Sequence, residues 1–496
     1  MRFLSVLLCA ASLAGPALAQ GGAKDVLTID VPNDVATMDP HLQSDLDSAA
    51  VYRNIFDHLI TRGADGRFAP QLASAWRYTD ETTLVFDLKT NIAFQDGSRV
   101  TPEDVVFSVR RIVDPALKSP QRGYYDLITS AEVTGPAQVT LRTRVPYPTL
   151  MAHLTHLAIV PKAYVEKVGD AAFNQQPVGT GPYRLREWRR GVQVVLDAQD
   201  ANWRGAPPFR SAAFRVVPDA ATRVADLRSG RADISRQMNA DDAQVIKGDA
   251  KLQVISVATE RVGYLFVNQL WGPTTDVRVR RAISMAIDRD TILATLFAGY
   301  AKPVDIMLAP VSFGYTPEVK AWPYDPAQAR ALIKEANAVG AQLVFLTSPF
   351  YDRRLVEAIQ QMLQEVGLKV EIRPLDNASY LRARQGTPQD AGSIAPGRWS
   401  CACQDADGTI FPLFRTGGIW AKYSNPEFDK LVDAARSTLD ETKRLGLYRS
   451  AFAILREDAP VVPLFQDAAI YGARKELRWR PTPDEAFQLM DMSWQP

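Results

Sequence analysis

Apolar positions along the chain follow either the alternating period of a strand or the 3.6-residue period of a helix. Residues 343–372 show both periods clearly. The apolar run 343–346 predicts a short buried strand, and the alternation over 368–372 predicts another strand. Between them lies a helical face, and Gly367 suits the position just after a helix end. This face consists of Leu355, Val356, Ile359, Met362, Leu363 and Val366. Strand, helix and strand within about 30 residues form a crossover, so we expect a parallel sheet here.

Polar residues mark the starts of three further helices. Thr101 suits an N-cap, Pro102 the first helical position and Asp104 the first turn, which predicts a helix beginning there. Amphipathic stretches also follow Asp276 and Asp325. Strand-like runs lie at 25–31, 193–197 and 213–217. The chain is therefore predicted to be a mixed α/β protein. Its 496 residues are too many for a single hydrophobic core, so we expect two or three domains.

The N-terminus carries the pattern of a secretory signal peptide. Arg2 precedes an apolar run over 3–14, and residues 17–19 form a small-residue cleavage site. The run is shorter than the roughly 20 residues that a membrane span needs. We predict cleavage near Ala19 and a mature protein in the periplasm. A buried N-terminal helix is the alternative.

The charge balance and the motifs that the sequence lacks narrow the function classes. The formal net charge is +1, and it becomes 0 when Arg2 leaves with the signal peptide. Such a chain has no field that gathers nucleic acid or an anionic membrane, so we expect no nucleic-acid partner. The sequence has no Gly-x-Ser-x-Gly elbow and no His-Glu-x-x-His pair. These absences argue against an exported hydrolase.

Seven stretches in a fixed order resemble one family of exported receptors. They lie at 94–111, 178–183, 227–234, 267–268 with 276–292, 324–336, 423–429, and 447–448 with 458–460. Together they are similar to the extracytoplasmic solute-binding proteins of dipeptide, oligopeptide and nickel ABC transporters, known as solute-binding protein family 5. The resemblance spans nearly the whole predicted mature chain.

The resemblance implies a two-lobed periplasmic binding protein fold with a hinge, and an extra subdomain in the first lobe. Lobe I would consist of 20–265 and 461–496, with the subdomain over about 46–177. Lobe II would be 266–460. The hinge would cross near 264–268 and 460–465, and closure of the lobes would bury a ligand.

The same resemblance places Trp399 at the ligand cleft. In peptide-binding relatives, an aspartate three places later meets the peptide ammonium group, and this chain has Ala402 there. Asp405 or Asp407 would take over the amine contact if the neighbouring cysteines reshape the loop. Alternatively, both acids cap a turn or the start of the next helix.

Further cleft candidates lie elsewhere in the chain. Arg398 and Arg353 are candidates for binding a ligand carboxylate, and a surface role is the alternative for each. Met38 lies in a stretch that resembles a first-lobe cleft turn. Gly179 and Thr180 belong to a glycine-rich turn whose amides would lie beside the cleft. A phosphate loop is excluded because no lysine follows this turn.

Cys401 and Cys403 are the cysteines that remain after signal cleavage. An exported chain meets oxidising conditions, so we predict a disulfide, although bridging across one residue is geometrically demanding. A pair of packed thiols is the alternative. With no second cysteine pair and no histidine nearby, we expect no metal site and no cofactor. Nickel-binding relatives place a histidine in lobe II, where this chain has none.

We therefore predict a receptor, not an enzyme. It would be a monomer that captures a peptide or related polar solute and delivers it to an inner-membrane ABC permease. Receptors for opine or sugar conjugates or for metal chelates are alternatives of the same class. An exported hydrolase and a chaperone that grips extended chains are alternatives of other classes.

Overall fold

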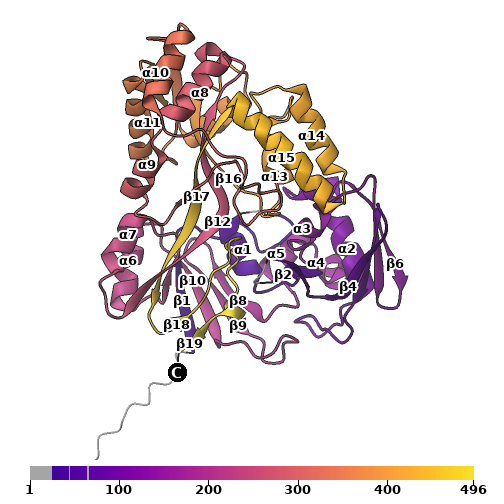
Figure 1. The fold of residues 1–496 in the computed structure, drawn as a ribbon. Coiled ribbons are helices and arrows are strands. Elements are labelled where there is room, and N and C mark those ends of the chain that lie inside the picture. The colour runs from indigo at the N-terminus through magenta and orange to yellow at the C-terminus, as the bar shows by residue number, and fades with distance from the viewer. Residues whose placement is uncertain (1–24, 44, 64–65, 496) are drawn as a thin grey trace, which may run out of the picture.

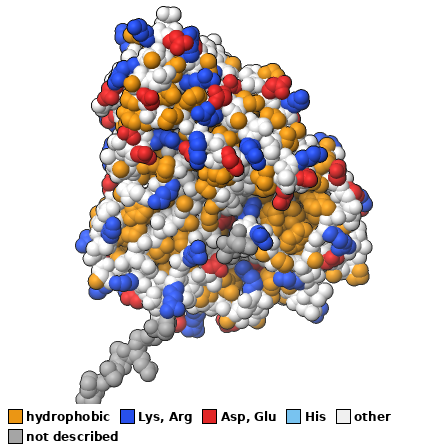
Figure 2. All heavy atoms as spheres, in the orientation of Figure 1, with side chains coloured by type: hydrophobic (Ala, Val, Ile, Leu, Met, Phe, Trp, Pro, Cys, Tyr) orange, Lys and Arg blue, Asp and Glu red, His pale blue; other side chains and the backbone are white. Residues whose placement is uncertain are grey.

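The computed structural model describes residues 25–43, 45–63 and 66–495, so the predicted signal peptide lies outside the described residues. The chain forms two lobes joined by two long antiparallel strands, β12 (Leu252–Val267) and β17 (Val461–Arg474) (Figure 1). Within the described ranges, no helix combines the length and the apolar character that a membrane crossing requires. Figure 2 shows acidic and basic side chains interspersed over the visible face of both lobes.

The first lobe is built on a mixed sheet. β1 (Val26–Val31) pairs in parallel with β10 (Ser211–Val216) and with β11 (Ile234–Ser235). The sheet continues antiparallel through β9 (Gln193–Ala198) to β8 (Tyr183–Arg189). Its helices are α1 (Leu46–Tyr52), α4 (Lys162–Val168), α5 (Asp170–Gln175), α6 (Ala220–Ser229) and α7 (Ala240–Ile246).

A separate sheet and core form a subdomain of this lobe, at the right of Figure 1. The sheet order is β4-β5-β7-β6, from β4 (Ala73–Asp80), β5 (Thr83–Leu88), β6 (Ile128–Gly135) and β7 (Gln138–Thr143). The remaining elements are β2 (Ile60–Arg62), β3 (Phe68–Pro70), α2 (Pro102–Val113) and α3 (Leu150–Leu154). The subdomain core extends from Leu59 to Ile159, whereas α1 and α5 pack in the main core of the lobe. This core is narrower than the predicted range 46–177.

The second lobe is built around the predicted crossover. β14 (Gln342–Thr347), α11 (Arg353–Glu365) and β15 (Lys369–Pro374) follow one another, and the two strands are parallel, which confirms that prediction. Apart from the crossing strands, the other strands of this lobe are β16 (Ile394–Trp399) and β13 (Lys302–Pro303). One core holds α8 (Val277–Ala286), α9 (Arg289–Leu296), α10 (Pro326–Glu335) and α11. The other holds α12 (Asn377–Gln385), α13 (Asp407–Phe414), α14 (Pro426–Arg436) and α15 (Glu441–Asp458).

The predicted helix starts are also confirmed. The carboxylate of Asp104 accepts a hydrogen bond from the Thr101 backbone N–H at 2.8 Å, at the start of α2. Asp276 caps α8 by accepting the N–H of Arg278, and Asp325 caps α10. These local signals work because the first turn of a helix leaves backbone donors free for a side-chain acceptor.

One sheet runs through both lobes in the order β15-β14-β16-β12-β17-β11-β1-β10-β9-β8, and β13 pairs with β17. The ladder between β12 and β17 breaks where the chain passes between lobes. Ala258 pairs with Ala468 and Val262 with Gln466, so three residues of β12 lie opposite Asp467 alone. This is a β-bulge, which bends a strand and redirects side chains.

The crossing between lobes lies at the bulge. Val262 to Val267 and Val461 to Phe465 already pack in second-lobe cores. The chain therefore passes from one lobe to the other at 259–261 on β12 and at 466–468 on β17. These positions lie a few residues from the crossings predicted at 264–268 and 460–465. The β-rich runs indicated these strands, but the bulge sets where along them the lobes separate.

The C-terminal segment returns to the first lobe after β17. It ends in the pair of β18 (Leu477–Arg478) and β19 (Ser493–Trp494), and Phe487 and Leu489 are buried in the first-lobe core. Residues 482–485 thereby lie against the bulge, where the Glu260 N–H bonds to the carbonyl oxygen of Pro483 at 3.3 Å.

Candidate functional site

A cavity of about 280 Å³ lies between the lobes beside the crossing strands. Its second-lobe wall comes from the loop after β14 and the end of β16, and its first-lobe wall from residues 238–241 after β11. These are the carboxyl ends of strands in both lobes, where ligands of α/β sheets usually bind. The position of the cavity makes it the candidate ligand site.

Aromatic side chains form much of the cavity wall. They come from β12, from the segment after α9, from the loop after β14 and from β17: Tyr264, Phe297, Tyr300, Phe350, Tyr351 and Phe465. Aromatic faces supply large contact area and tolerate varied ligands. The site can therefore accept an organic solute with apolar parts.

A chain of charged groups runs from the cavity wall to the C-terminal segment. Arg398 of β16 forms an ion pair with Asp467 of β17, and both line the cavity. Arg261 of the bulge lies 3.7 Å from Asp467 and 2.9 Å from Glu485. Burial lowers the pKa of Arg398 to about 10, so this guanidinium stays charged at neutral pH. It is a cation at the cavity wall that can meet a ligand carboxylate.

Glu260 lies next to Arg261 in the bulge and is only 8% exposed. One of its carboxyl oxygens, Oε2, has no hydrogen-bond partner among the described residues. Gln404 of the second lobe bonds to the carboxyl group, and burial, followed by the nearby Asp484 and Glu485, raises the pKa of Glu260 to about 8. A buried carboxyl with a free acceptor is costly unless a partner arrives.

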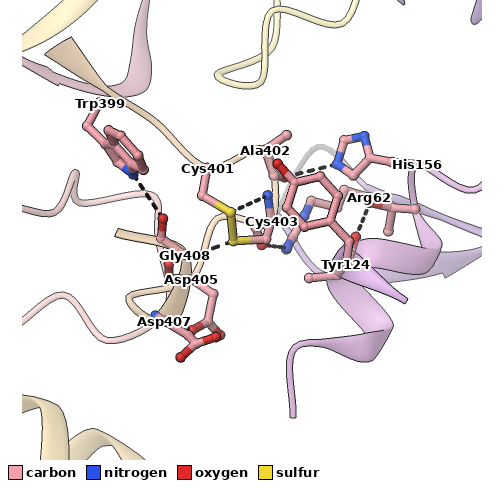
Figure 3. Close-up of a disulfide and its surroundings, with 12 residues drawn as sticks. Arg62, Tyr124, His156, Trp399, Cys401, Ala402, Cys403, Asp405, Asp407 and Gly408 are labelled. Carbon is pink, nitrogen blue, oxygen red and sulfur yellow. Dashed lines mark hydrogen bonds between the residues drawn. A yellow bond between two sulfur atoms is a disulfide. The ribbon is translucent and has the colours of Figure 1, made fainter. Parts of the chain in front are cut away.

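Cys401 and Cys403 form a disulfide in the loop between β16 and α13. The loop touches the first lobe through its backbone (Figure 3). His156 Nε2 lies 2.9 Å from the carbonyl oxygen of Ala402, and Arg62 Nη2 donates to that of Cys403 at 2.7 Å. The disulfide loop, residues 401–404, is thus a contact between lobes.

Asp405 and Asp407 each form an ion pair within the second lobe. Both oxygens of Asp405 accept hydrogen bonds from buried Arg444, at 2.6 and 2.7 Å, and one also accepts the N–H of Asp407. Asp407 pairs with Arg436 at 3.1 Å, and burial raises its pKa to about 6. In Figure 3 both carboxylates point away from Arg62. Asp405 thus caps a turn, as the capping alternative predicts, whereas Asp407 makes an ion pair and no capping hydrogen bond, and neither acid lines the cavity.

The two candidate arginines lie in different surroundings. Arg398 lines the cavity, and its guanidinium carbon lies 5.8 Å from the ring centre of Phe350. Arg353 has an 88% exposed side chain that pairs with Glu357 one helical turn away. The surface alternative therefore describes Arg353, because the helix start directs this side chain to solvent. Trp399 donates its indole N–H to the carbonyl oxygen of Gly408 at 2.9 Å and contacts Trp420, outside the cavity lining.

The first-lobe candidates hold the fold together. Met38 is fully buried in the main core of the lobe. At Gly179 an added Cβ would lie 2.0 Å from the carbonyl oxygen of Ile55, so only glycine permits this close approach. Thr180 is buried and donates to Asp57 at 2.9 Å. The structure brings none of these three to the cavity wall.

Four charged residues near the cavity escaped the sequence reasoning: Glu260, Arg261, Asp467 and Glu485. The first three interrupt the apolar runs of the crossing strands, and that interruption was the available signal. Their proximity depends on the pairing of strands some 200 positions apart, which no local pattern shows.

Fold and site together define a two-lobed solute-binding protein. The chain belongs to the bacterial extracellular solute-binding proteins of family 5, because the family model described as "family 5 Middle" matches residues 67–420. The predicted family and the predicted two-lobed fold are confirmed. Homologues of this kind are the substrate-binding components of ABC importers.

Named relatives cover nearly the whole chain. The glutathione-binding protein GsiB of Salmonella typhimurium is 30% identical over 99% of this chain and 98% of its own length. The periplasmic binding protein DppA of Helicobacter pylori, in complex with the peptide STSA, has a TM-score of 0.80 at 23% identity, covering 96% of this chain and 99% of that one. NikZ of Campylobacter jejuni, in complex with Ni(L-His), has a TM-score of 0.81 at 21% identity, covering 95% and 99%.

Proposed function

We propose that this protein captures a small peptide between its lobes and delivers it to an inner-membrane ABC permease. The observation that carries the proposal is the cavity between the lobes, with aromatic walls and the Arg398 guanidinium at its edge. A volume of about 280 Å³ suits a short peptide and is too small for an extended protein chain. A chaperone role is therefore disfavoured.

Reduced glutathione is the first candidate ligand. Its two carboxylates suit guanidinium groups, and both Arg398 and Arg354 line the cavity. Its ammonium group suits the acidic residues beside the bulge. The relation to GsiB over nearly the full length of both chains supports the same choice.

The protein binds its ligand without transforming it, acts as a monomer, and works outside the inner membrane after cleavage near Ala19. The family and its binding-protein relatives support an extracytoplasmic receptor. Mass spectrometry of the protein from the periplasm tests the cleavage site, and sedimentation tests the monomer.

Titration calorimetry on ligand-stripped protein tests the proposed function. The probes are reduced and oxidised glutathione, dialanine, trialanine, mannopinic acid and nickel–histidine. We expect saturable binding of glutathione or a short peptide, with the probe recovered unchanged by mass spectrometry. Binding of mannopinic acid or nickel–histidine alone would favour a non-peptide receptor, and a cleaved probe would favour a hydrolase.

A further inference from the structure

The carboxyl group of Glu260 is set up to accept a hydrogen bond that the protein itself does not provide. Its side chain is more than nine-tenths buried, and Oε2 has no hydrogen-bond partner in the described chain. Leaving such an acceptor unsatisfied costs about 1–3 kcal/mol by mutational measures. A group that persists in this state indicates a missing partner.

The charged groups around Glu260 indicate that the missing partner is a cation. Asp484 and Glu485 approach from the C-terminal segment, and Gln404 approaches from the disulfide loop. Of the nearby cations, Arg53 pairs with Asp484 at 3.1 Å, and Arg62 keeps one donor, Nε, without a hydrogen-bond partner among the described residues. Arg261 pairs with Glu485 and Asp467, and Arg62 donates to the carbonyl oxygens of Gly66 and Cys403. A ligand cation would relieve the repulsion among the acids and fill the free acceptor of Glu260.

Glu260 does not itself line the cavity, and its connection to the cavity is the strand pairing at the bulge. It projects from the bulge at which the lobes exchange, opposite Asp467, which lines the cavity. The groups around it come from the first lobe through 484–485 and from the second lobe through Gln404. A ligand that reaches from the cavity to Glu260 therefore contacts both lobes and favours their closed arrangement.

We propose that Glu260 receives the primary ammonium group of the ligand, an inference that rests on the proposed peptide-binding function. An ammonium group fits better than a metal ion, because the described residues hold no group of three or more His, Cys, Asp or Glu side chains arranged to bind one. The ligand class is thus a solute with one free amine at one end and a carboxylate for Arg398 at the other.

Paired probes test this role by calorimetry on the ligand-stripped, full mature protein. Reduced glutathione is compared with glutaryl-cysteinylglycine, which lacks only the amine, and trialanine with N-acetyl-trialanine. We expect the wild type to bind the amine forms at least about tenfold more tightly, as for a charge-assisted contact. In Glu260→Gln this preference should fall to about threefold or less. Binding of an amine form at pH 7 should release close to one proton from the wild type and none from the variant.

The variant should fold, because Gln has the volume of Glu and resembles its protonated form. Glu357→Gln on the exposed face of α11 is the matched control and should retain the amine preference. Equal binding of the paired probes by the wild type, or an amine preference that survives in Glu260→Gln, would overturn this inference and leave the proposed function standing. Failure of every probe to bind the wild type would overturn the proposed function and this inference with it.

Discussion

At the scale of single residues, the ion pairs within the protein decide which charged groups are available to a ligand. Asp405 meets Arg444 and Arg353 meets Glu357, so neither is free at the cavity. Arg398 also has a partner, Asp467, but that pair lies in the cavity wall, and Arg261 is within reach of the same carboxylate. A ligand carboxylate can therefore share Arg398 without leaving Asp467 unpaired.

Arg398→Ala should weaken binding of glutathione or trialanine at least about tenfold, or roughly 1.4 kcal/mol. The physical reason is the loss of the guanidinium at the cavity wall. Titration calorimetry measures the change, and Arg353→Ala is the control because it removes an arginine from the exposed start of α11. Equal losses in the two variants would contradict the assignment of Arg398 to the site.

The raised pKa of Glu260 also predicts how the free energy of unfolding depends on pH. Its pKa is raised from 4.5 to about 8 in the folded protein, so between these values the folded state keeps a proton that the unfolded state loses. The free energy of unfolding should therefore fall as pH rises from 4.5 to 8, by up to about 1.4 kcal/mol per pH unit from this group. Below pH 4.5 and above pH 8 the group should add no slope.

Urea unfolding of ligand-free protein at several pH values measures this effect as the difference between the wild type and Glu260→Gln. Subtraction removes the other titrating groups, such as Asp407, whose pKa is also raised. A difference that stays constant from pH 5 to pH 8 would show that Glu260 is ionised in the folded protein.

At the scale of elements, the disulfide loop is a contact between the two lobes. Its carbonyl oxygens receive Arg62 and His156 of the first lobe. Burial, with the adjacent Arg53 as the next cause, lowers the pKa of His156 to about 4, so the ring is neutral near pH 7. Arg53 lies 2.6 Å from Nδ1, which leaves Nε2 to donate to Ala402. The contact therefore does not depend on protonation in the physiological range.

The double variant Cys401→Ser, Cys403→Ser should bind ligand several-fold more weakly. A loop without its cross-link must be ordered on closure, and ordering one residue costs about 1–2 kcal/mol. Calorimetry on the variant measures the loss. The melting temperature should change little, because so short a cross-link constrains the unfolded chain weakly. Unchanged affinity would show that the loop is ordered without the bond, and two alkylated thiols in periplasmic wild-type protein would contradict the disulfide itself.

At the scale of the whole molecule, the lobes are joined through two strands and also touch away from them. Arg354 of α11 lies 3.5 Å from Asp241 of α7, and the disulfide loop touches the first lobe on its own. Motion of the lobes therefore needs little more than a change at the bulge, together with the breaking of a few polar contacts. This is the arrangement of a hinge.

A bound peptide should favour the arrangement with these contacts made. Small-angle scattering of ligand-stripped protein should give a radius of gyration that decreases when a saturating amount of the bound probe is added. Arg398→Ala at the same probe concentration is the control for a ligand-dependent change. Identical curves with and without a probe that calorimetry shows to bind would contradict closure by the ligand.

The sequence by itself determined the class, the local elements and the family. The crossover at 343–372 and the helix caps at Asp276 and Asp325 depend on neighbours in the chain, so periodicity and capping chemistry reveal them. The crossing strands were also visible as β-rich runs. Only the tertiary structure decided which acids are free, because Asp405 and Arg444 are 39 positions apart and Glu260 meets Asp484 across more than 200. Burial and the pairing of distant charges, which set the chemistry of the cleft, arise when the chain packs and leave no local pattern in it.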